Sequence, residues 1–178
     1  KNADAPNAVY SNPNSVKMGT IHSSKGLEYP IVFLVGCGKS FSNRTFNSEV
    51  LKDKTLGIGM NYYNLEYSEK YTTLARNAIT INIKKQEKAE ELRLLYVALT
   101  RAKNHLIIIG SKNINSIARI KNFREAQAVN CFANWLLCGL SDVAFNSLKQ
   151  GKTEFLDKHK TFDIKFNVYS DNFFDVNA

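Results

Sequence analysis

Residues 20–28 read TIHSSKGLE, and a short apolar run, Ile31–Val35, follows them. A second dense stretch, EELRLLYVALTRAK at residues 90–103, leads into another apolar run, Leu106–Ile109. Continuous apolar runs of this length are typical of buried parallel strands. Hydroxyl groups, an imidazole or a guanidinium, and a lysine therefore lie at a strand end in each case, where α/β folds place their ligands. The two stretches together predict an α/β fold with phosphate chemistry.

The composition is that of a single globular domain. The chain has 178 residues, of which 44% are apolar and 22% are charged, and this is enough for one core. No run approaches the roughly 18 apolar residues of a membrane span, and Lys1–Val9 lacks the apolar core of a signal peptide. We therefore expect a cytoplasmic protein with no membrane partner.

Charge and cysteine content limit the classes of partner. The net charge of +8 favours an anionic partner such as nucleic acid. The three cysteines, Cys37, Cys131 and Cys138, lack paired short spacing, so they predict no disulfide framework or zinc site and are expected to be buried. His105 and His159 lack partners at metal-ligand spacing, which favours structural or solvated roles.

The first half of the chain predicts a linker followed by a strand, a turn and a hairpin. Residues 1–15 carry two prolines and many small polar residues, which is typical of an extended linker. Val16–Ile21 alternates like a short strand, and residues 22–27 are expected to form a turn or a helical turn. A surface hairpin is expected where Val50–Leu51 and Leu56–Tyr62 flank a polar turn.

The second half is predicted to be mainly helical. Apolar residues at helical spacing over Tyr71–Ile83 and again over Leu92–Ala102 predict one long helix or two consecutive helices. A third helix is expected at about Ala126–Leu140, and a short one before Gly151. Phe162–Val168 then alternates like a strand. The apolar stripe of Leu92, Leu95 and Leu99 and the single tryptophan, Trp135, are expected in the core.

The two motif stretches, intact and in this order, closely resemble the two C-terminal signature motifs of superfamily 1 DNA helicases of the UvrD/Rep type. Within that group the chain is most similar to the bacterial helicase/nuclease A subunits called AddA, because LGIG at residues 56–59 is followed by a helix and then by AEELRLLYVALTRA at 89–102. The resemblance covers residues 16–110 firmly and Phe132–Leu140 loosely. It implies a RecA-like, P-loop NTPase-type parallel sheet over 16–110, which is an incomplete second motor domain, and a C-terminal helical connector over 111–178.

The resemblance also implies roles for individual residues of the first stretch. A polar turn with exposed amides, hydroxyls and a lysine can meet phosphates, and a glycine allows close approach. The plain alternative for each residue taken alone is a capped surface loop. The resemblance implies that Thr20, His22, Ser23 and Lys25 face single-stranded DNA, and that Gly26 and Glu28 face ATP.

Arg101 is the residue of the second stretch to which the resemblance assigns catalysis. Its always-charged, planar guanidinium suits the spread charge of a γ-phosphoryl transition state. The resemblance implies that Arg101 contacts the γ-phosphate of bound ATP, as the matching arginine of the family does. The alternative is a cation that stabilises the helix C-terminus by about half a kcal/mol. Arg93 and Glu91 are expected to form ion pairs on the helix surface.

Two sequences imitate the end of a Walker A loop without matching it. Gly38-Lys39-Ser40 and Gly151-Lys152-Thr153 would each need a glycine five positions before their own, and Phe33 and Asn146 occupy those positions. A dinucleotide fingerprint beginning at Gly36 likewise fails at Phe41. We therefore expect this chain alone to be inactive as an ATPase.

The function implied is an ATP-dependent DNA helicase acting in double-strand break repair and recombination. The resemblance implies ATP with Mg²⁺, bound mainly by an N-terminal helicase domain of the same protein, together with single-stranded DNA and a second helicase/nuclease subunit. Two alternatives remain open from the residues: a UvrD/PcrA-type repair helicase without a nuclease, and a degenerate module that only holds single-stranded DNA.

Overall fold

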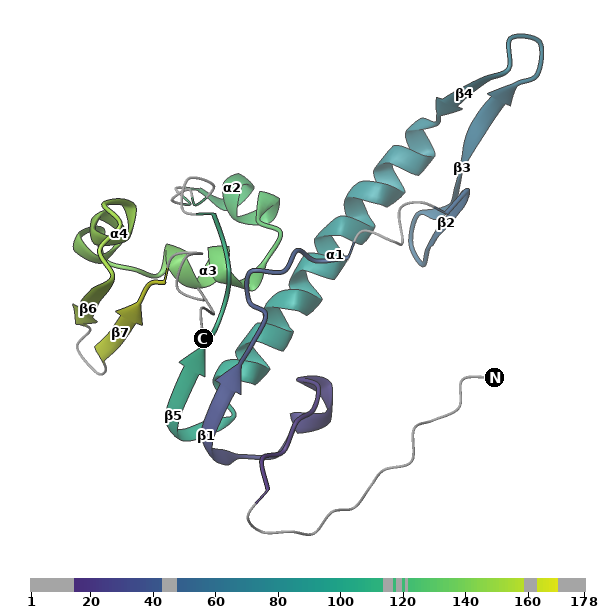
Figure 1. The fold of residues 1–178 in the computed structure, drawn as a ribbon. Coiled ribbons are helices and arrows are strands. Elements are labelled where there is room, and N and C mark those ends of the chain that lie inside the picture. The colour runs from purple at the N-terminus through teal and green to yellow at the C-terminus, as the bar shows by residue number, and fades with distance from the viewer. Residues whose placement is uncertain are drawn as a thin grey trace, which may run out of the picture.

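A parallel strand pair and one long helix form the centre of the structure (Figure 1). The structure is a computed structural model that describes residues 15–42, 48–113, 117, 120, 122–158 and 163–169. In this part of the chain the elements run η1 (His22–Ser24), β1 (Tyr29–Leu34), β2 (Val50–Asp53), β3 (Gly57–Asn64), β4 (Glu69–Thr72), α1 (Leu74–Leu99), β5 (Ala102–Ile108), α2 (Phe123–Ala128), α3 (Phe132–Cys138), α4 (Asp142–Lys149), β6 (Glu154–Lys158) and β7 (Asp163–Asn167).

The two apolar runs pair as parallel strands, as the sequence predicts. In β1 and β5, Val32 lies opposite Leu106 and Leu34 lies opposite Ile108. The ladder continues past the strands, because the Ile109 amide donates to the carbonyl of Leu34 at 2.8 Å. Since β1 and β5 are neighbours, the two motif stretches that precede them are brought to one end of the sheet.

Helix α1 is one continuous helix of 26 residues, which confirms the first of the two predicted options. It begins where the Thr73 hydroxyl accepts a hydrogen bond from the Arg76 amide at 3.2 Å, the usual N-cap arrangement. It ends at Leu99, and β5 begins three residues later. At 1.5 Å per residue, α1 is about 39 Å long, so its two ends belong to different regions of the molecule.

The central core lies between the strand pair, α1 and α3. Its buried residues are Leu34, Cys37, Leu95 and Ala98, and Trp135 of α3 packs against them. Cys37 and Cys131 are buried, as expected, whereas Cys138 is only partly buried. The core expectation is wrong for Leu92, which is 53% exposed because the described residues cover α1 on one side only.

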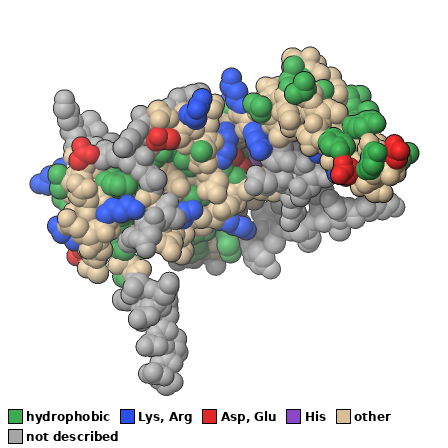
Figure 2. Space-filling view, turned by 90° about the horizontal axis from the view of Figure 1, so that it is seen from above, with side chains coloured by type: hydrophobic (Ala, Val, Ile, Leu, Met, Phe, Trp, Pro, Cys, Tyr) green, Lys and Arg blue, Asp and Glu red, His purple; other side chains and the backbone are tan. Residues whose placement is uncertain are grey.

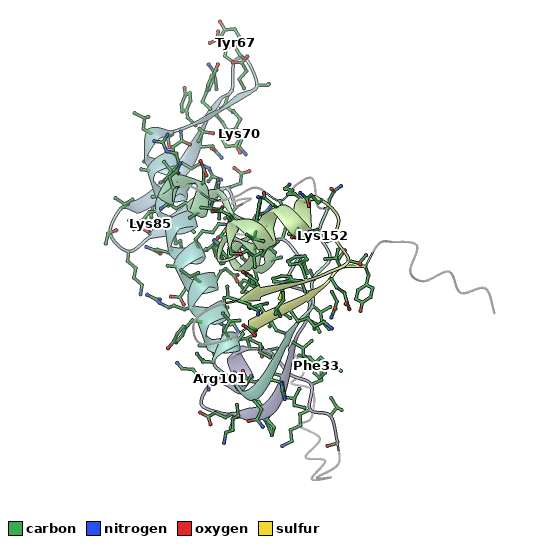
Figure 3. The ribbon with its side chains drawn as sticks, turned by 90° about the vertical axis from the view of Figure 1, so that its left-hand side faces the viewer. Phe33, Tyr67, Lys70, Lys85, Arg101 and Lys152 are labelled. Carbon is green, nitrogen blue, oxygen red and sulfur yellow. The ribbon has the colours of Figure 1, made fainter. Side chains whose placement is uncertain are left out.

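The predicted burial of the β1 strand is wrong on one of its two faces. Ile31 is 52% exposed, Phe33 is 59% exposed and Val35 is 67% exposed. Figure 3 shows Phe33 on the side of the sheet away from α1. A parallel sheet is normally covered on both faces, and the described residues cover only one.

The predicted strand at Val16–Ile21 is absent from the described residues. Residues 15–20 have no regular secondary structure, and Val16 and Met18 are each 97% exposed. An extended segment needs a neighbouring strand to satisfy its backbone groups, and none of the described residues forms one beside it. The following turn is confirmed as the short 3₁₀ helix η1. The linker predicted for residues 1–15 falls almost wholly outside the described residues.

The predicted hairpin is part of a three-stranded antiparallel sheet, β2–β3–β4, which we call the arm (residues 49–72). The arm projects from the N-terminal end of α1 (Figure 1). Asp53 shapes its first turn by accepting from the Thr55 and Leu56 amides, both at 2.9 Å. Gly59 faces α1, where a Cβ atom would lie 2.7 Å from the Arg76 Cα. Gly59, the last residue of the LGIG sequence, therefore allows β3 to pack closely on α1.

The single helix predicted for Ala126–Leu140 is wrong, because two helices, α2 and α3, form instead. The chain is extended at Val129 and Cys131 between them. The break is fixed by distant residues, since the Phe41 amide donates to the Asn130 carbonyl at 2.7 Å.

The short helix predicted before Gly151 is confirmed as α4. The last predicted strand is confirmed as β7, which pairs with β6. No helix in the described ranges is long and apolar enough to cross a membrane.

Candidate functional site

The two motif stretches meet at the amino ends of β1 and β5. The Tyr29 amide donates to the Arg101 carbonyl at 2.9 Å, which joins the first residue of β1 to the residue before β5. Figure 3 places Arg101 at this end of the molecule. Ligands of open α/β sheets usually bind beyond the carboxyl ends of the strands, so the position of this cluster differs from the general rule.

The Arg101 side chain connects the end of α1 to the first motif stretch. Its Nε donates to the Val97 carbonyl at 3.0 Å, its Nη1 donates to the Leu27 carbonyl at 2.8 Å, and its Nη2 donates to the Thr100 hydroxyl at 3.0 Å. These bonds use three of the five guanidinium N–H donors, so the contacts within the described chain leave two for an anion. Arg101 therefore stabilises the end of α1 and holds the Leu27 backbone beside it.

Glu28 and Gly26 lie beside this connection. The Glu28 Oε2 lies 3.3 Å from the Lys103 Nζ, and both side chains are more than half exposed. Gly26 has φ +84°, a left-handed conformation that disfavours other residues, and no atom lies within 4 Å of the place a Cβ would take. The backbone at Gly26 is thus open to a ligand approaching from solvent.

The turn formed by η1 is held by two hydroxyl side chains. The Ser23 hydroxyl accepts from the Thr20 amide at 3.1 Å, and the Ser23 amide donates to the Thr20 hydroxyl at 3.2 Å. These reciprocal bonds fix the turn and leave His22 and Lys25 exposed on its surface. The four residues are therefore together and all exposed, and Thr20 and Ser23 also shape the turn.

Glu91 belongs to this region in a way that the sequence did not predict. It is partly buried rather than on the open surface, and burial is the largest cause that raises the pKa of its carboxyl group. The positive charges of Lys88 and His22 oppose this rise, so the Glu91 carboxyl group lies within electrostatic range of η1. The expectation of a surface ion pair is confirmed for Arg93, whose partner is Glu90.

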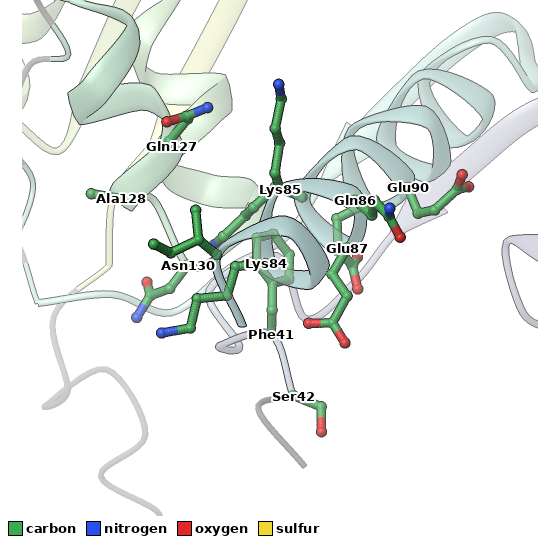
Figure 4. A pocket seen from close by; sticks show the side chains of 13 residues that line it. Phe41, Ser42, Lys84, Lys85, Gln86, Glu87, Glu90, Gln127, Ala128 and Asn130 are labelled. Atoms are coloured by element: carbon green, nitrogen blue, oxygen red, sulfur yellow. The ribbon is translucent and has the colours of Figure 1, made fainter. Parts of the chain in front are cut away.

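A surface hollow of about 840 Å³ lies against the middle of α1 and extends to Glu90 and Glu91, the first residues of the second motif stretch (Figure 4). Lysines and glutamates both line it, and none of the predicted site residues does. At its edge the Lys88 ammonium donates to the Val129 carbonyl and lies 4.7 Å from the centre of the Phe41 ring. Burial lowers the pKa of Lys88. This lysine ties the break between α2 and α3 to α1, so its role is packing.

The two Walker-like sequences are used for packing and chain reversal. A Cβ at Gly38 would lie 1.8 Å from the carbonyl oxygen of Ser111, so this glycine allows close backbone contact. Gly151 has φ +72° and follows α4, where its amide donates to the Leu148 carbonyl at 3.1 Å. That is an ordinary helix C-terminus leading into a strand, whereas a P-loop leads from a strand into a helix.

The remaining histidine and metal expectations concern residues outside the cluster. His105 is exposed on β5, and His159 lies outside the described residues. Among the residues that the structure describes, no group of three His, Cys, Asp or Glu side chains is placed to hold a metal ion.

Comparison with known proteins gives consistent matches. Residues 2–113 match the family model of the UvrD-like helicase C-terminal domain. The A subunit of the ATP-dependent helicase/nuclease of Clostridium botulinum (strain Alaska E43 / Type E3) is 48% identical over 100 residues, which are 56% of this chain and 8% of that protein. The corresponding A subunit from Bacillus velezensis is 44% identical over 131 residues, 73% of this chain and 10% of its own length. The one from Bacillus pumilus is 43% identical over 122 residues, 68% and 10% respectively.

These matches confirm the resemblance drawn from the two motif stretches. The chain spans about a tenth of the length of the curated relatives it matches.

Proposed function

Because this chain belongs to the family of UvrD-like helicase C-terminal domains, we propose that it forms one wall of an ATP-driven DNA motor in a helicase/nuclease of the AddA type. The observation that carries the proposal is the bond from Arg101 to the Leu27 carbonyl at 2.8 Å. It joins the stretch assigned to DNA and ribose to the stretch assigned to the γ-phosphate. A change at either ligand would therefore be felt directly at the other.

On the ATP side, three residues have complementary tasks. The two N–H donors that Arg101 retains would meet the charge that develops on the γ-phosphoryl group. Glu28 would accept hydrogen bonds from the ribose hydroxyls. The open backbone at Gly26 would allow the nucleotide to approach. The phosphate cradle and the ligands for Mg²⁺ would come mainly from an N-terminal helicase domain of the same protein.

On the DNA side, η1 would present its exposed groups to a single strand. His22 and Lys25 would contact the phosphates, and Thr20 and Ser23 would offer the ordered turn and its hydroxyl groups. Such contacts favour binding without base readout and with strong salt dependence. Closure of two motor domains on ATP would then move the strand across this surface.

The exposed face of the β1–β5 pair supports a RecA-like fold for residues 16–110. An isolated two-stranded parallel sheet with an apolar outer face is not expected to persist in water, so further strands and helices would complete it. Residues 111–178 would then lead out of the motor as the connector, although α3 already packs on the central core. The proposed partners are single-stranded DNA, the N-terminal helicase domain and a second helicase/nuclease subunit.

Nucleotide discrimination by the full-length protein tests the role of Glu28. We expect Glu28→Ala to raise KM for ATP and to abolish the preference for ATP over dideoxy-ATP, since the carboxylate would bind the ribose hydroxyls. Lys103→Ala breaks the same 3.3 Å ion pair and should keep that preference. If both variants behave alike, Glu28 serves only the ion pair and the nucleotide assignment is wrong.

A further inference from the structure

The arm has an apolar face that none of the described residues covers. Val50 lies opposite Met60 and Tyr62 lies opposite Tyr71, so each pair is on one side of the sheet, and Ile58 shares that side by alternation along β3. Ile58, Met60 and Tyr62 are 61%, 56% and 59% exposed. We call these five residues the arm face. Figure 2 shows hydrophobic side chains gathered at the end of the molecule that the arm forms.

The arm is held in one conformation before any partner arrives. On its other side Leu51 is buried against α1, and the Arg76 guanidinium donates to the Ser48 carbonyl at 2.7 Å and the Glu49 carbonyl at 2.9 Å. The Glu49 carboxylate also accepts from Lys70 at 2.8 Å and from the Tyr63 hydroxyl at 2.5 Å. A preformed surface loses less conformational freedom on binding, which favours a docking role.

The charge of the arm argues against nucleic acid as its binding partner. Residues 49–72 contain three lysines and four acidic residues, a net charge of −1, whereas the whole chain carries +8, so the remainder carries +9. Binding to nucleic acid depends on neutralising phosphates with cations. The arm is thus the acidic region of a basic chain, and its occupant is expected to be a protein.

The composition of the arm face separates it from the other exposed sheet face. The outer face of the β1–β5 pair carries Ile31, Phe33 and Val35, which have no polar group and resemble the core of a domain. The arm face contains Met60 and two tyrosines, the residue types enriched where separately folded proteins meet. Tyrosine hydroxyls tolerate water before assembly. The arm also lies at the opposite end of α1 from Arg101 (Figure 3).

We infer that the arm face docks the second polypeptide of the helicase/nuclease assembly. The partner surface would be apolar at its centre, with basic side chains at its edge facing Glu66 and Glu69 near the arm tip. This inference rests on the proposed function, since the relatives are named as one lettered subunit of a helicase/nuclease, and such a subunit implies a partner. It adds the surface on which that partner binds.

Affinity between the two purified polypeptides tests this assignment. The double variant Ile58→Ser/Tyr62→Ser of the full-length AddA-type protein should show about tenfold or more weaker binding to its cognate second polypeptide, as truncation of central interface residues does. Leu156→Ser is the matched control, because Leu156 is also a half-exposed aliphatic residue on a strand, in β6. It should bind within twofold of wild type. DNA-stimulated ATP turnover of the AddA-type protein by itself should be retained in both variants.

Three results would overturn the assignment. Unchanged affinity in the double variant would show that the second polypeptide binds elsewhere. A lower melting temperature with lost ATPase activity in the AddA-type protein by itself would show that the arm face packs within the same polypeptide. If the wild-type AddA-type protein has the mass of two copies and the double variant has the mass of one, the arm face mediates self-association instead. Failure of the proposed function is distinguishable, because it would appear as absent ATPase activity in wild-type protein.

Site-specific crosslinking provides a second measurement that does not depend on weakened folding. Tyr67 is 69% exposed at the arm tip, so Tyr67→Cys can carry a thiol-linked photo-crosslinker. We expect covalent capture of the purified second polypeptide by this variant and not by Leu156→Cys. Crosslinks confined to the AddA-type protein itself, or equal capture by both variants, would contradict the assignment.

Discussion

The guanidinium Nη1 of Arg101 lies 2.8 Å from the carbonyl oxygen of Leu27, although the two residues are 74 positions apart in the chain. This bond joins the residue before β5 to the turn before β1. A single side chain thereby bonds a carbonyl in the last turn of α1 and also supports the first motif stretch. The structural and the catalytic interpretations of Arg101 are therefore compatible, and experiments must separate them.

Arg101→Ala in the full-length enzyme should reduce ATP turnover by roughly a hundredfold or more with a much smaller change in KM, because an arginine that meets developing charge acts in the transition state. Arg101→Lys should recover little, since a point charge cannot reproduce the planar donor set. Steady-state ATPase kinetics on DNA, with melting temperatures measured alongside, test this. Arg93→Ala is the control and should stay near wild type, because its partner Glu90 is exposed. Normal turnover in Arg101→Ala would make the arginine purely structural.

The double variant His22→Ala/Lys25→Ala should weaken single-stranded DNA binding and reduce its salt dependence, because both side chains are exposed on η1 and would contact phosphates. His105→Ala/Lys165→Ala removes the same two residue types elsewhere and should have little effect. Fluorescence anisotropy over a range of salt concentrations measures both. Equal losses in the two variants would remove η1 from the DNA path.

The isolated chain should hydrolyse no ATP above background, since it has no Walker A loop and phosphoryl transfer needs a phosphate cradle and metal ligands. Phosphate release by purified protein with Mg²⁺ and DNA measures this. Turnover that disappears in Lys39→Ala or Lys152→Ala would reveal a phosphate-binding loop in one of the two Walker-like sequences.

Gly59→Ala should lower the free energy of unfolding by about 1–3 kcal/mol, because the new Cβ would lie 2.7 Å from the Arg76 Cα and backbone atoms cannot easily move aside. Gly139→Ala is the control, since its Cβ would meet only the Leu136 carbonyl at 3.4 Å. Urea denaturation of both variants compares them. A neutral Gly59→Ala would show that β3 can shift away from α1.

Glu49→Gln should destabilise the arm at neutral pH and lose this effect in acid. Hydrogen bonds from Lys70 and then Tyr63 lower the pKa of Glu49 from 4.5 to about 2. A lowered pKa in the folded state contributes stability above the unfolded value, so the contribution is lost as pH falls from 4.5 towards 2. Melting temperatures of wild type and Glu49→Gln should therefore converge over this range. The exposed pair of Glu154 and Lys165 predicts a smaller difference for Glu154→Gln.

The sequence predicted those features that depend on neighbours along the chain. Apolar runs identified β1 and β5, helical spacing identified α1 and α4, and polar turn residues identified the β2–β3 hairpin. The two motif stretches identified the family, because a long specific string carries more information than composition. In the site, local sequence also predicted the turn at η1, which Thr20 and Ser23 close with their own hydroxyl groups.

The features that sequence did not predict depend on residues far apart in the chain. Leu92 has the same helical spacing as Leu95, yet one is exposed and the other buried, because only one side of α1 is covered. Val129 interrupts a helical pattern because its carbonyl accepts a hydrogen bond from Lys88 of α1. The neighbouring Asn130 carbonyl accepts one from the Phe41 amide.

Sequence by itself therefore determined β1, β5, α1, α4 and the β2–β3 hairpin, together with their order and the family of this protein. Tertiary structure alone decided that the two motif stretches meet at the amino ends of β1 and β5, through the Arg101 to Leu27 bond, and that Glu91 is partly buried. It also decided that the arm leaves an apolar face open. The physical reason is that periodicity records which side of an element is apolar, whereas burial and hydrogen bonding depend on which distant segment covers that side.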